Sequence, residues 1–465
     1  MSARSLEDLL TSAGSPVELL RNSQIGANVF PGVPPEYTNW RDEQRAWQQT
    51  CVLFNQSFHM NDLEVEGPDA LALLSHLGVN SFAGYTGDRA KHFVPCTPDG
   101  YVIGDVILFR IGEERFNLVG RAPALNWITY HAETGGYDVR IDLDLRTALR
   151  TDGRRRSYRF QLQGPNAMQV IAKALGAAPP DLEFFRTTTV TIAGKTVGAL
   201  RHGMVGQPGW ELFGPWADEK AVREALLAAG EEFGLLQAGS RTYSSNTVES
   251  GWIPSPLPAV YTGERMRAYR EWLPAAGYEG SASIGGSFVS EDIEDYYFTP
   301  WDLGYGPYVK FDHEFVGREA LAQMADDEHR TKVTLALDDE DVTRAIGTMF
   351  GPPEQRAKFI DWPSGVYAMH QYDRVAVDDE TVGVSTWISY TANEGKLLTL
   401  AVLDSAYSEP GTEVTFVWGE EDGGTSKPTV EPHVQTEIRA VVSPVPYVET
   451  VRTSYAPGGW RTAHA

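Results

Sequence analysis

The sequence contains NDLEVEGPDALALLSHLG at residues 61–78 and YRFQLQGPNAMQVIAKALG at residues 158–176, which look like two copies of one unit. Each stretch begins with apolar residues at every second position, which is the period of a β-strand. Each continues with Gly-Pro, then with Asp69 or Asn166, and then with apolar residues at helical spacing. A proline in the first turn and a polar starting residue are typical of helix beginnings. The repeat therefore predicts a duplicated α+β core; two unrelated strand-helix turns are the alternative.

The sequence pattern changes near Lys332. From there onward, short runs of alternating apolar residues are separated by glycine, proline and acidic turns, as in TVGVSTWISY and GTEVTFVWG. This pattern is typical of a small all-β domain and favours a barrel. We place the boundary after the helix expected at GREALAQMADDE. The chain is therefore expected to divide into a core of residues 1–330 and a C-terminal β-barrel of residues 331–465.

The charge balance limits the classes of partner. The chain has 465 residues, with 63 acidic against 39 basic side chains and a formal net charge of −24. This length is enough for two or three domains. Nucleic acids and anionic membrane surfaces are bound through an excess of lysine and arginine, so neither is expected as a partner. We interpret the acidity as a contribution to solubility.

Cysteine usage and the N-terminus bear on the compartment. The only cysteines are Cys51 and Cys96, and there is no CxxC motif. Structural disulfides and a thiolate zinc site are therefore not expected, which fits the reducing cytoplasm. The N-terminal stretch carries acidic residues and lacks the apolar run of a signal peptide. No apolar run approaches the roughly 20 residues that a membrane-spanning helix needs. We expect a cytoplasmic protein.

The common nucleotide-binding and catalytic motifs do not occur. The sequence has no GxGxxG, no P-loop, no GxSxG and no HExxH. These patterns would have indicated dinucleotide, phosphate, hydrolase or zinc-protease sites. The ten histidines lack the spacing of metal ligands, so no metal site is predicted. Composition and pattern alone therefore predict only a cytoplasmic α+β protein with a β-rich C-terminal part.

Several segments resemble the glycine-cleavage T-protein family, the folate-dependent aminomethyltransferases. These segments are DGYVIGDVILFRIGEERFNLVGRA, FQLQGPNA, GQPGWELFGP, LGYGPYVKFDHEFVGREAL and SEPGTEVTFVWG. They follow one another over most of the chain. The resemblance implies that family's folate-binding core, followed by its C-terminal barrel.

Other segments resemble a narrower group, the tetrahydrofolate-dependent aryl methyl ether demethylases, and this similarity runs from end to end. They include LLRNSQIGANVFPGVPPEYTNWRDEQRAW, SNTVESGWIPSPLPAVYTG and the stretch from AYREWLPA to DIEDYY. The resemblance implies methyl transfer from a methoxybenzoate of the vanillate, syringate or 3-O-methylgallate type to N5 of tetrahydrofolate. The products would be a phenol and 5-methyltetrahydrofolate, in the catabolism of lignin-derived aromatics. A monomer and a homodimer both fit.

The stretch SRTYSSNTVESGW, at residues 240–252, holds one tyrosine among many serines. A core helix is not expected to tolerate so many hydroxyl groups, and a surface loop would not require the tyrosine. T-protein relatives have an Arg-Asp-x-x-Arg-x-Glu-x-Gly helix here; Glu249 and Gly251 keep their places, whereas Tyr243 and Thr247 replace arginines. A leaving phenol needs a proton donor, and a tyrosine with a pKa of about 10 stays protonated at neutral pH. We predict that Tyr243 is the catalytic acid; a buried ring with a satisfied hydroxyl is the alternative.

The resemblance places four residues around the aromatic substrate. His59, in NQSFHMNDL, matches a histidine that faces the substrate in the demethylases, and Gln56 accompanies it. Phe30 lies in the matching N-terminal segment. Arg121 follows an apolar strand, and its forked donors suit the benzoate carboxylate. A structural histidine and a surface arginine are the alternatives.

Four further residues are assigned to tetrahydrofolate by the same resemblance. Glu211 occupies the place of the folate-binding glutamate, where a carboxylate can accept paired hydrogen bonds from the amino-pyrimidine edge of the pterin. Trp252 can pack on a flat ring, with core packing as the alternative. Asp105 matches the acidic turn of the aminomethyltransferases. Val119 lies in the strand that leads to Arg121.

Three other functions share parts of this resemblance. An aminomethyltransferase, or a demethylase of a sulfonium such as dimethylsulfoniopropionate, has the same fold, but a sulfonium leaves as a neutral thioether and needs no acid. A non-catalytic folate-binding protein of the iron–sulfur maintenance type has a Lys-Gly-Cys-Tyr signature, whereas this chain has KFDHEFVGRE without cysteine. The folate domain of a sarcosine-type oxidase would require a flavin domain.

Overall fold

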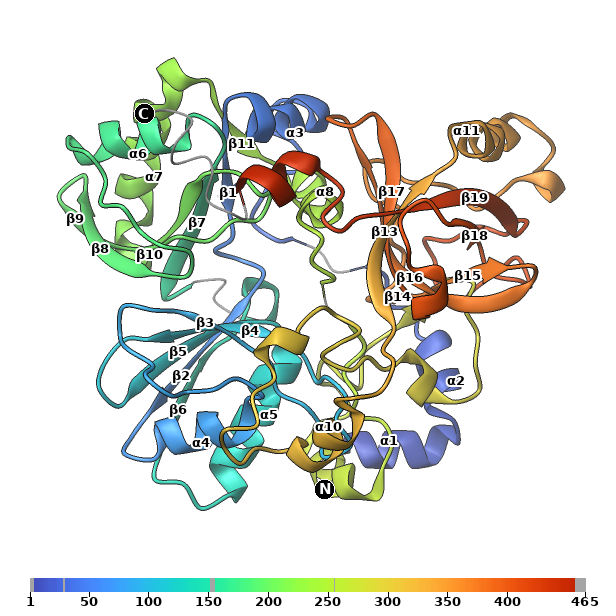
Figure 1. Ribbon diagram of the computed structural model, residues 1–465, viewed down its shortest axis with the longest axis horizontal. Helices are drawn as coiled ribbons and strands as arrows, with labels where there is room; N and C mark the ends of the chain where they lie inside the picture. Colours follow the sequence, from blue (N-terminus) through green and yellow to red (C-terminus); the bar gives the residue numbers. More distant parts are fainter. Residues whose placement is uncertain (1–3, 28–29, 151–154, 255, 456–465) are drawn as a thin grey trace.

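The fold consists of two sheet-and-helix lobes and a barrel, arranged around a common centre (Figure 1). The structure is a computed structural model that describes residues 4–27, 30–150, 155–254 and 256–455. The two open sheets and the closed barrel confirm the predicted α+β class with a C-terminal barrel.

The first lobe contains the first copy of the repeat. Its five-stranded sheet has the order β3-β4-β5-β2-β6, in which β2 pairs antiparallel with both β5 and β6. The elements of this lobe are β2 (Asn61–Glu66), α4 (Ala70–Leu77), β3 (Lys91–Phe93), β4 (Val106–Arg110), β5 (Arg115–Gly120), α5 (Ala122–Thr134) and β6 (Arg140–Asp144).

The second lobe contains the second copy. Its six-stranded sheet has the order β11-β1-β7-β10-β9-β8. The elements are α3 (Trp40–Gln49), β1 (Cys51–Asn55), β7 (Ser157–Gln163), α6 (Ala167–Leu175), β8 (Thr187–Ile192), β9 (Lys195–Leu200), β10 (Gly209–Pro215), α7 (Glu219–Gly230), β11 (Leu235–Ala238) and α8 (Ser240–Ser250).

The two copies turn from strand to helix in the same way. Gly67 and Gly164 have φ values of 146° and 136°, in the region that favours glycine. A Cβ atom at Gly67 would lie 2.3 Å from the Asp138 carbonyl oxygen, and one at Gly164 would lie 2.5 Å from the Thr50 carbonyl oxygen. Both turns therefore require glycine for two separate reasons, the backbone angle and the close approach of a neighbouring backbone segment.

The helix starts differ in detail from the prediction. α4 and α6 begin one residue after Asp69 and Asn166, so each proline precedes the cap instead of standing in the first turn. Neither cap side chain bonds to its own helix. The Asp69 carboxylate accepts from the Asp138 backbone N–H, whereas the Asn166 amide donates to the Phe233 carbonyl. These side chains tie each turn to its lobe.

The two faces of β7 have opposite chemistry. Tyr158, Phe160 and Leu162 pack into the apolar core of the second lobe. The alternating residues Arg159 and Gln161 are also buried but lie on the other face. Superposing Gly67 on Gly164 matches Asp62 of β2 with Arg159 of β7, so charged residues of opposite sign occupy one position of the repeat.

The serine-rich stretch forms α8, which corrects the expectation that a core helix would not tolerate it. Thr242, Ser245 and Thr247 are buried. The hydroxyls of Ser244 and Ser245 donate to carbonyl groups three residues earlier, at 2.8 Å each. These local bonds, together with the bond of the Thr242 hydroxyl to Glu43 of α3, satisfy the hydroxyls and allow the helix to be buried.

The barrel follows the two lobes. Its closed strand order is β13-β17-β16-β15-β18-β19, with an apolar interior. The elements are β13 (Thr331–Leu337), α11 (Asp339–Gly347), β15 (Asp373–Val377), β16 (Glu380–Thr391), β17 (Lys396–Leu403), β18 (Glu413–Trp418) and β19 (Thr436–Ser443). Because β13 begins at Thr331, we keep residue 330 as the proposed domain boundary.

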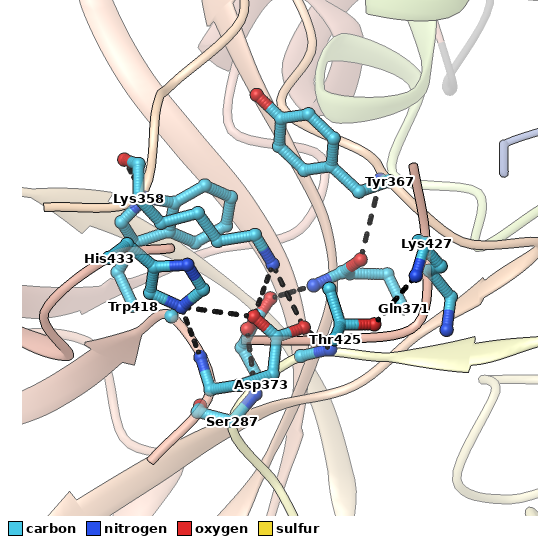
Figure 2. Close-up of polar contacts among 12 residues, drawn as sticks. Ser287, Lys358, Tyr367, Gln371, Asp373, Trp418, Thr425, Lys427 and His433 are labelled. Atoms are coloured by element: carbon cyan, nitrogen blue, oxygen red, sulfur yellow. Dashed lines mark hydrogen bonds and ion pairs between the residues drawn. The ribbon is translucent and has the colours of Figure 1, made fainter. Parts of the chain in front are cut away.

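A buried polar cluster joins the barrel to the preceding core (Figure 2). Lys358 Nζ donates to the two Glu420 carboxylate oxygens at 3.1 and 2.9 Å. Glu420 also accepts from the Gly286 N–H at 3.0 Å, and Asp373 accepts from the Ser287 N–H at 3.1 Å. Since each charged group has a partner, the cluster is satisfied and fixes the position of the barrel.

The remaining elements cover these parts. They are α1 (Leu6–Ala13), α2 (Pro16–Arg21), α9 (Arg267–Trp272), α10 (Arg318–Met324) and the short strands β12 (Ile284–Gly285) and β14 (His370–Gln371), which pair with each other. Within the residues described, no helix has the length and apolar character to cross a membrane.

Candidate active site

A cavity of about 430 Å³ lies where the two sheets, α8 and the barrel meet. The second lobe contributes Glu211 from β10, and the barrel contributes Lys332 and Trp387. All nine residues singled out from the sequence line it: Phe30, Gln56, His59, Asp105, Val119, Arg121, Glu211, Tyr243 and Trp252. The structure therefore brings these side chains together, while their individual roles stay predictions.

Tyr243 and His59 form a hydrogen-bonded pair on the cavity wall. The Tyr243 hydroxyl lies 3.0 Å from His59 Nε2 and 3.4 Å from Gln56 Nε2. Burial raises the pKa of Tyr243 above its usual value, so the phenol is protonated at neutral pH. Burial, together with Arg121 among nearby cations, lowers the pKa of His59 to about 3. Both groups of the pair are therefore neutral.

The ring of Phe30 completes this wall. Its centroid lies 4.8 Å from that of Tyr243 and 5.0 Å from that of His59. Beside it, Gln56 Oε1 is buried and accepts no hydrogen bond from any residue that the structure describes. A buried acceptor without a donor is costly, so this atom is available to a hydroxyl group on a bound ring.

Arg121 precedes α5 and lines the same cavity. Its side chain does not cap the helix, and it forms no ion pair with a carboxylate in the described part of the chain. Its charge acts on both His59 and Tyr243, so it lies close to the pair. An unpaired guanidinium at this place suits a carboxylate ligand, because its planar donors match two oxygens.

Glu211 belongs to a buried charge network at another part of the cavity. The Arg159 guanidinium donates to Glu211 Oε1, and His202 Nδ1 lies 3.6 Å from Glu211 Oε2. Burial opposes ionisation of Glu211, but Arg159 and His202 together hold its pKa below the usual value. Arg159 Nη2 also lies 3.5 Å from Asp62. Glu211 is therefore an ionised carboxylate. Its Oε1 atom accepts a hydrogen bond from Arg159, whereas its Oε2 atom has only the more distant contact with His202.

Asp105 anchors a third group of side chains. His92 Nε2 lies 2.5 Å from Asp105 Oδ2, and Trp252 Nε1 donates to the same oxygen at 3.1 Å. The indole N–H also lies 3.0 Å from the Tyr305 hydroxyl. Val119 of β5, which is 4% exposed, belongs to an apolar cluster with Phe109 of β4 and Leu200 of β9.

Comparison with known proteins identifies the family. A model described as the GCVT N-terminal domain matches residues 26–255. A syringate O-demethylase from Sphingobium sp. (strain SYK-6) is 60% identical over 463 residues, covering 100% of both chains. The chain belongs to the GCVT family. The expected relationship to the T-protein and to the aryl demethylases is thereby confirmed.

More distant relatives support the same family assignment. A sesamin methylene transferase from Sinomonas sp. (strain No.22) is 30% identical, covering 91% of this chain and 92% of that protein. The glycine-cleavage aminomethyltransferase T structure from Bartonella henselae has a TM-score of 0.59 and 19% identity, covering 96% of this chain and 99% of that chain. The structural likeness shows that the aminomethyltransferase fold extends over 96% of this chain.

Sequence reasoning missed several residues of this GCVT site. His92, Arg159, His202, Tyr305 and Lys332 line the cavity but were not singled out. Arg159 gave no signal, because it occupies a polar position in the regular apolar–polar alternation of its strand. For the others no local signal exists, because the partners come from distant segments, as Asp105 does for His92.

Proposed function

We propose that this protein is a tetrahydrofolate-dependent O-demethylase, an enzyme of the methyltransferase type. It moves the methyl group of a methoxybenzoate to N5 of tetrahydrofolate and releases the phenol. The full-length similarity to a syringate O-demethylase supports this function. The structural observation that carries it is the neutral Tyr243–His59 pair beside Arg121 in one cavity.

The reaction balances with the residues of this pair. The bond from the methyl carbon to the phenolic oxygen breaks, and a bond from that carbon to N5 forms. The Tyr243 hydroxyl donates its proton to the departing phenolic oxygen, which would otherwise leave as a phenoxide. The proton that N5 loses returns to the Tyr243–His59 pair. Arg121 holds the benzoate carboxylate and aligns the ether with the acceptor, which reduces the entropic part of the barrier.

Two polar atoms of the cavity fit tetrahydrofolate as the co-substrate. Glu211 is an ionised, buried carboxylate, as the N–H donors of an amino-pyrimidine edge require. His202 Nδ1 is buried 3.6 Å from Glu211 Oε2, beside the same acceptor. In this proposal Glu211 binds the pterin, Trp252 and Val119 pack against the cofactor rings, and Asp105 lies near its reduced portion.

The identity of the α8 residues at positions 243 and 247 argues against the other GCVT reactions. A sulfonium releases a neutral thioether that needs no acid, and the T-protein pattern of the aminomethyltransferases has arginines where Tyr243 and Thr247 stand here. Both of these residues line the cavity. A phenolic donor on the cavity wall therefore favours an aryl ether over these alternatives.

The test is anaerobic incubation of the purified protein with tetrahydrofolate and a panel of syringate, vanillate and 3-O-methylgallate. Chromatography should show the demethylated phenol and 5-methyltetrahydrofolate in a 1:1 ratio. Syringate is the first choice because the 60% identical relative is named for it. Formation of the phenol without tetrahydrofolate, or with formaldehyde as the second product, contradicts the proposal.

We also propose a cytoplasmic location, since Cys51 and Cys96 are free and buried.

A further inference from the structure

Lys332 brings a positive charge from the barrel into the cavity. It is the second residue of β13 and lines the same cavity as Tyr243 and Glu211. Its side chain is half-buried, and burial lowers its pKa to about 8. Its ammonium group forms no hydrogen bond or ion pair with the residues that the structure describes. A half-buried, unpaired ammonium is costly and therefore indicates a place for an anion.

The cavity has two chemically different ends. Glu211 is 5% exposed and lies beside His202. Trp252 and Tyr308 are each 39% exposed and lie beside Asp105, so this end of the cavity is open to water. Lys332 belongs to this open end, because Asp105 is the charged group that acts on it.

Asp105 does not neutralise Lys332 by direct contact. Its Oδ2 atom is engaged by His92 Nε2 at 2.5 Å and by Trp252 Nε1 at 3.1 Å. Lys332 Nζ lies near Gly304 instead, where an added Cβ atom would be 3.5 Å away. The ammonium group therefore keeps its donors for a ligand, while Asp105 is already compensated by other groups.

We propose that Lys332 binds a glutamyl carboxylate of tetrahydrofolate. This inference rests on the proposed function. Tetrahydrofolate is a reduced pterin joined through an aminobenzoyl group to a glutamate with two carboxylates. If the pterin edge lies on Glu211, the glutamyl tail extends toward the open end, where Lys332 meets one carboxylate and water meets the other. The benzoate carboxylate of the aromatic substrate has its own cation in Arg121.

The experiment compares three ligands by anaerobic calorimetry. They are tetrahydrofolate, its diamide with both glutamyl carboxylates amidated, and 6-methyltetrahydropterin, which has no tail. The unchanged protein should bind tetrahydrofolate roughly five- to fiftyfold more tightly than the diamide. Lys332→Met should bind the two equally and should keep its affinity for 6-methyltetrahydropterin. Lys332→Arg should restore part of the preference, whereas Lys310→Met, at an exposed position, should change nothing.

Several results would overturn the inference. One is unchanged tetrahydrofolate affinity in Lys332→Met, and another is an equal loss for 6-methyltetrahydropterin, which would place the charge at the pterin. A change confined to the methoxybenzoate KM would assign Lys332 to the aromatic substrate. If Lys332→Met does not fold, the unchanged protein decides alone, because equal binding of tetrahydrofolate and diamide excludes a carboxylate site. A preference for tetrahydrofolate without methyl transfer would count against the proposed function only.

Discussion

The hydroxyl of Tyr243 lies 3.0 Å from Nε2 of His59, and burial acts on the two groups in opposite directions. It raises the pKa of Tyr243 and lowers that of His59 to about 3, so neither carries a charge at neutral pH. An imidazolium is therefore absent as a proton donor. The hydroxyl of Tyr243 remains as the proposed acid of this wall.

Tyr243→Phe tests this role directly. The substitution keeps the ring contacts with Phe30 and Phe54 and removes only the hydroxyl. We expect kcat on syringate to fall by roughly 10²–10⁴-fold, the range for one positioned acid, with little change in substrate binding. Steady-state kinetics and calorimetry with the substrate measure the two effects separately.

The leaving group supplies the control for Tyr243→Phe. Nitro-substituted methoxybenzenes release a weakly basic phenoxide that needs less help from an acid. The defect of the variant should therefore shrink on these compounds. A defect of the same size on good and poor leaving groups would return Tyr243 to a packing role.

Arg121→Ala should separate charged from uncharged substrates. We expect the KM for methoxybenzoates to rise roughly tenfold to hundredfold, because a charge-assisted hydrogen bond is lost. The KM for the matching methoxyphenols should stay nearly constant. Arg115→Ala, at an exposed site on the preceding strand, is the matched control. Equal losses on both substrate classes would show that Arg121 supports the fold or the folate site.

Glu211→Gln should weaken tetrahydrofolate binding. A neutral amide presents one acceptor where the carboxylate presents two, so we expect the Kd to rise roughly tenfold to hundredfold. Calorimetry with tetrahydrofolate measures this change, and circular dichroism checks folding, because Arg159 loses its carboxylate partner. Unchanged affinity in a folded variant would remove Glu211 from the folate site.

Glu279 should make stability depend on pH. It is 1% exposed and accepts from Asn126 Nδ2 at 3.0 and 3.1 Å, and burial raises its pKa to about 6. A raised pKa in the folded state gives stability that is full below the unfolded value near 4.3 and is lost as the pH rises through 6.

Glu279→Gln removes this titration. Between pH 4 and pH 8, the free energy of unfolding of the variant relative to the unchanged protein should rise by about 2 kcal/mol. Urea unfolding of both proteins at the two pH values measures the difference. A difference that is independent of pH would show that Glu279 titrates normally.

The fold was largely predictable from the sequence because the repeat carries local signals. Gly67 and Gly164 mark turns that no other residue can make, and the alternation in each preceding strand is plain. α8 was harder to assign, since its hydroxyls are satisfied by bonds within the helix, as for Ser244 and Ser245, and by bonds to other elements, as for Thr242 with Glu43. Hydrophobic patterning cannot detect a helix that is buried through such bonds.

The candidate site was predictable only where family resemblance marked a residue. Lys332 shows why the rest was not: in the sequence it is an unremarkable lysine near the start of a strand. Its position in the cavity depends on how the barrel docks, which is set by contacts such as Glu420 with Gly286. Such long-range placement has no local sequence signature.

The contact between Asp62 and Arg159 bears on how such a site can arise. The two residues occupy the same position of the repeat, and their charged groups approach to 3.5 Å. In a symmetric dimer of one such unit, the same residue would stand on both sides of the axis, so like charges would face each other. Joining the copies in one chain removes that restriction, because each half can then change alone. The fused pair can therefore evolve a polarised interior, with an acid on one half and its counter-ion on the other, which two identical subunits could not build there.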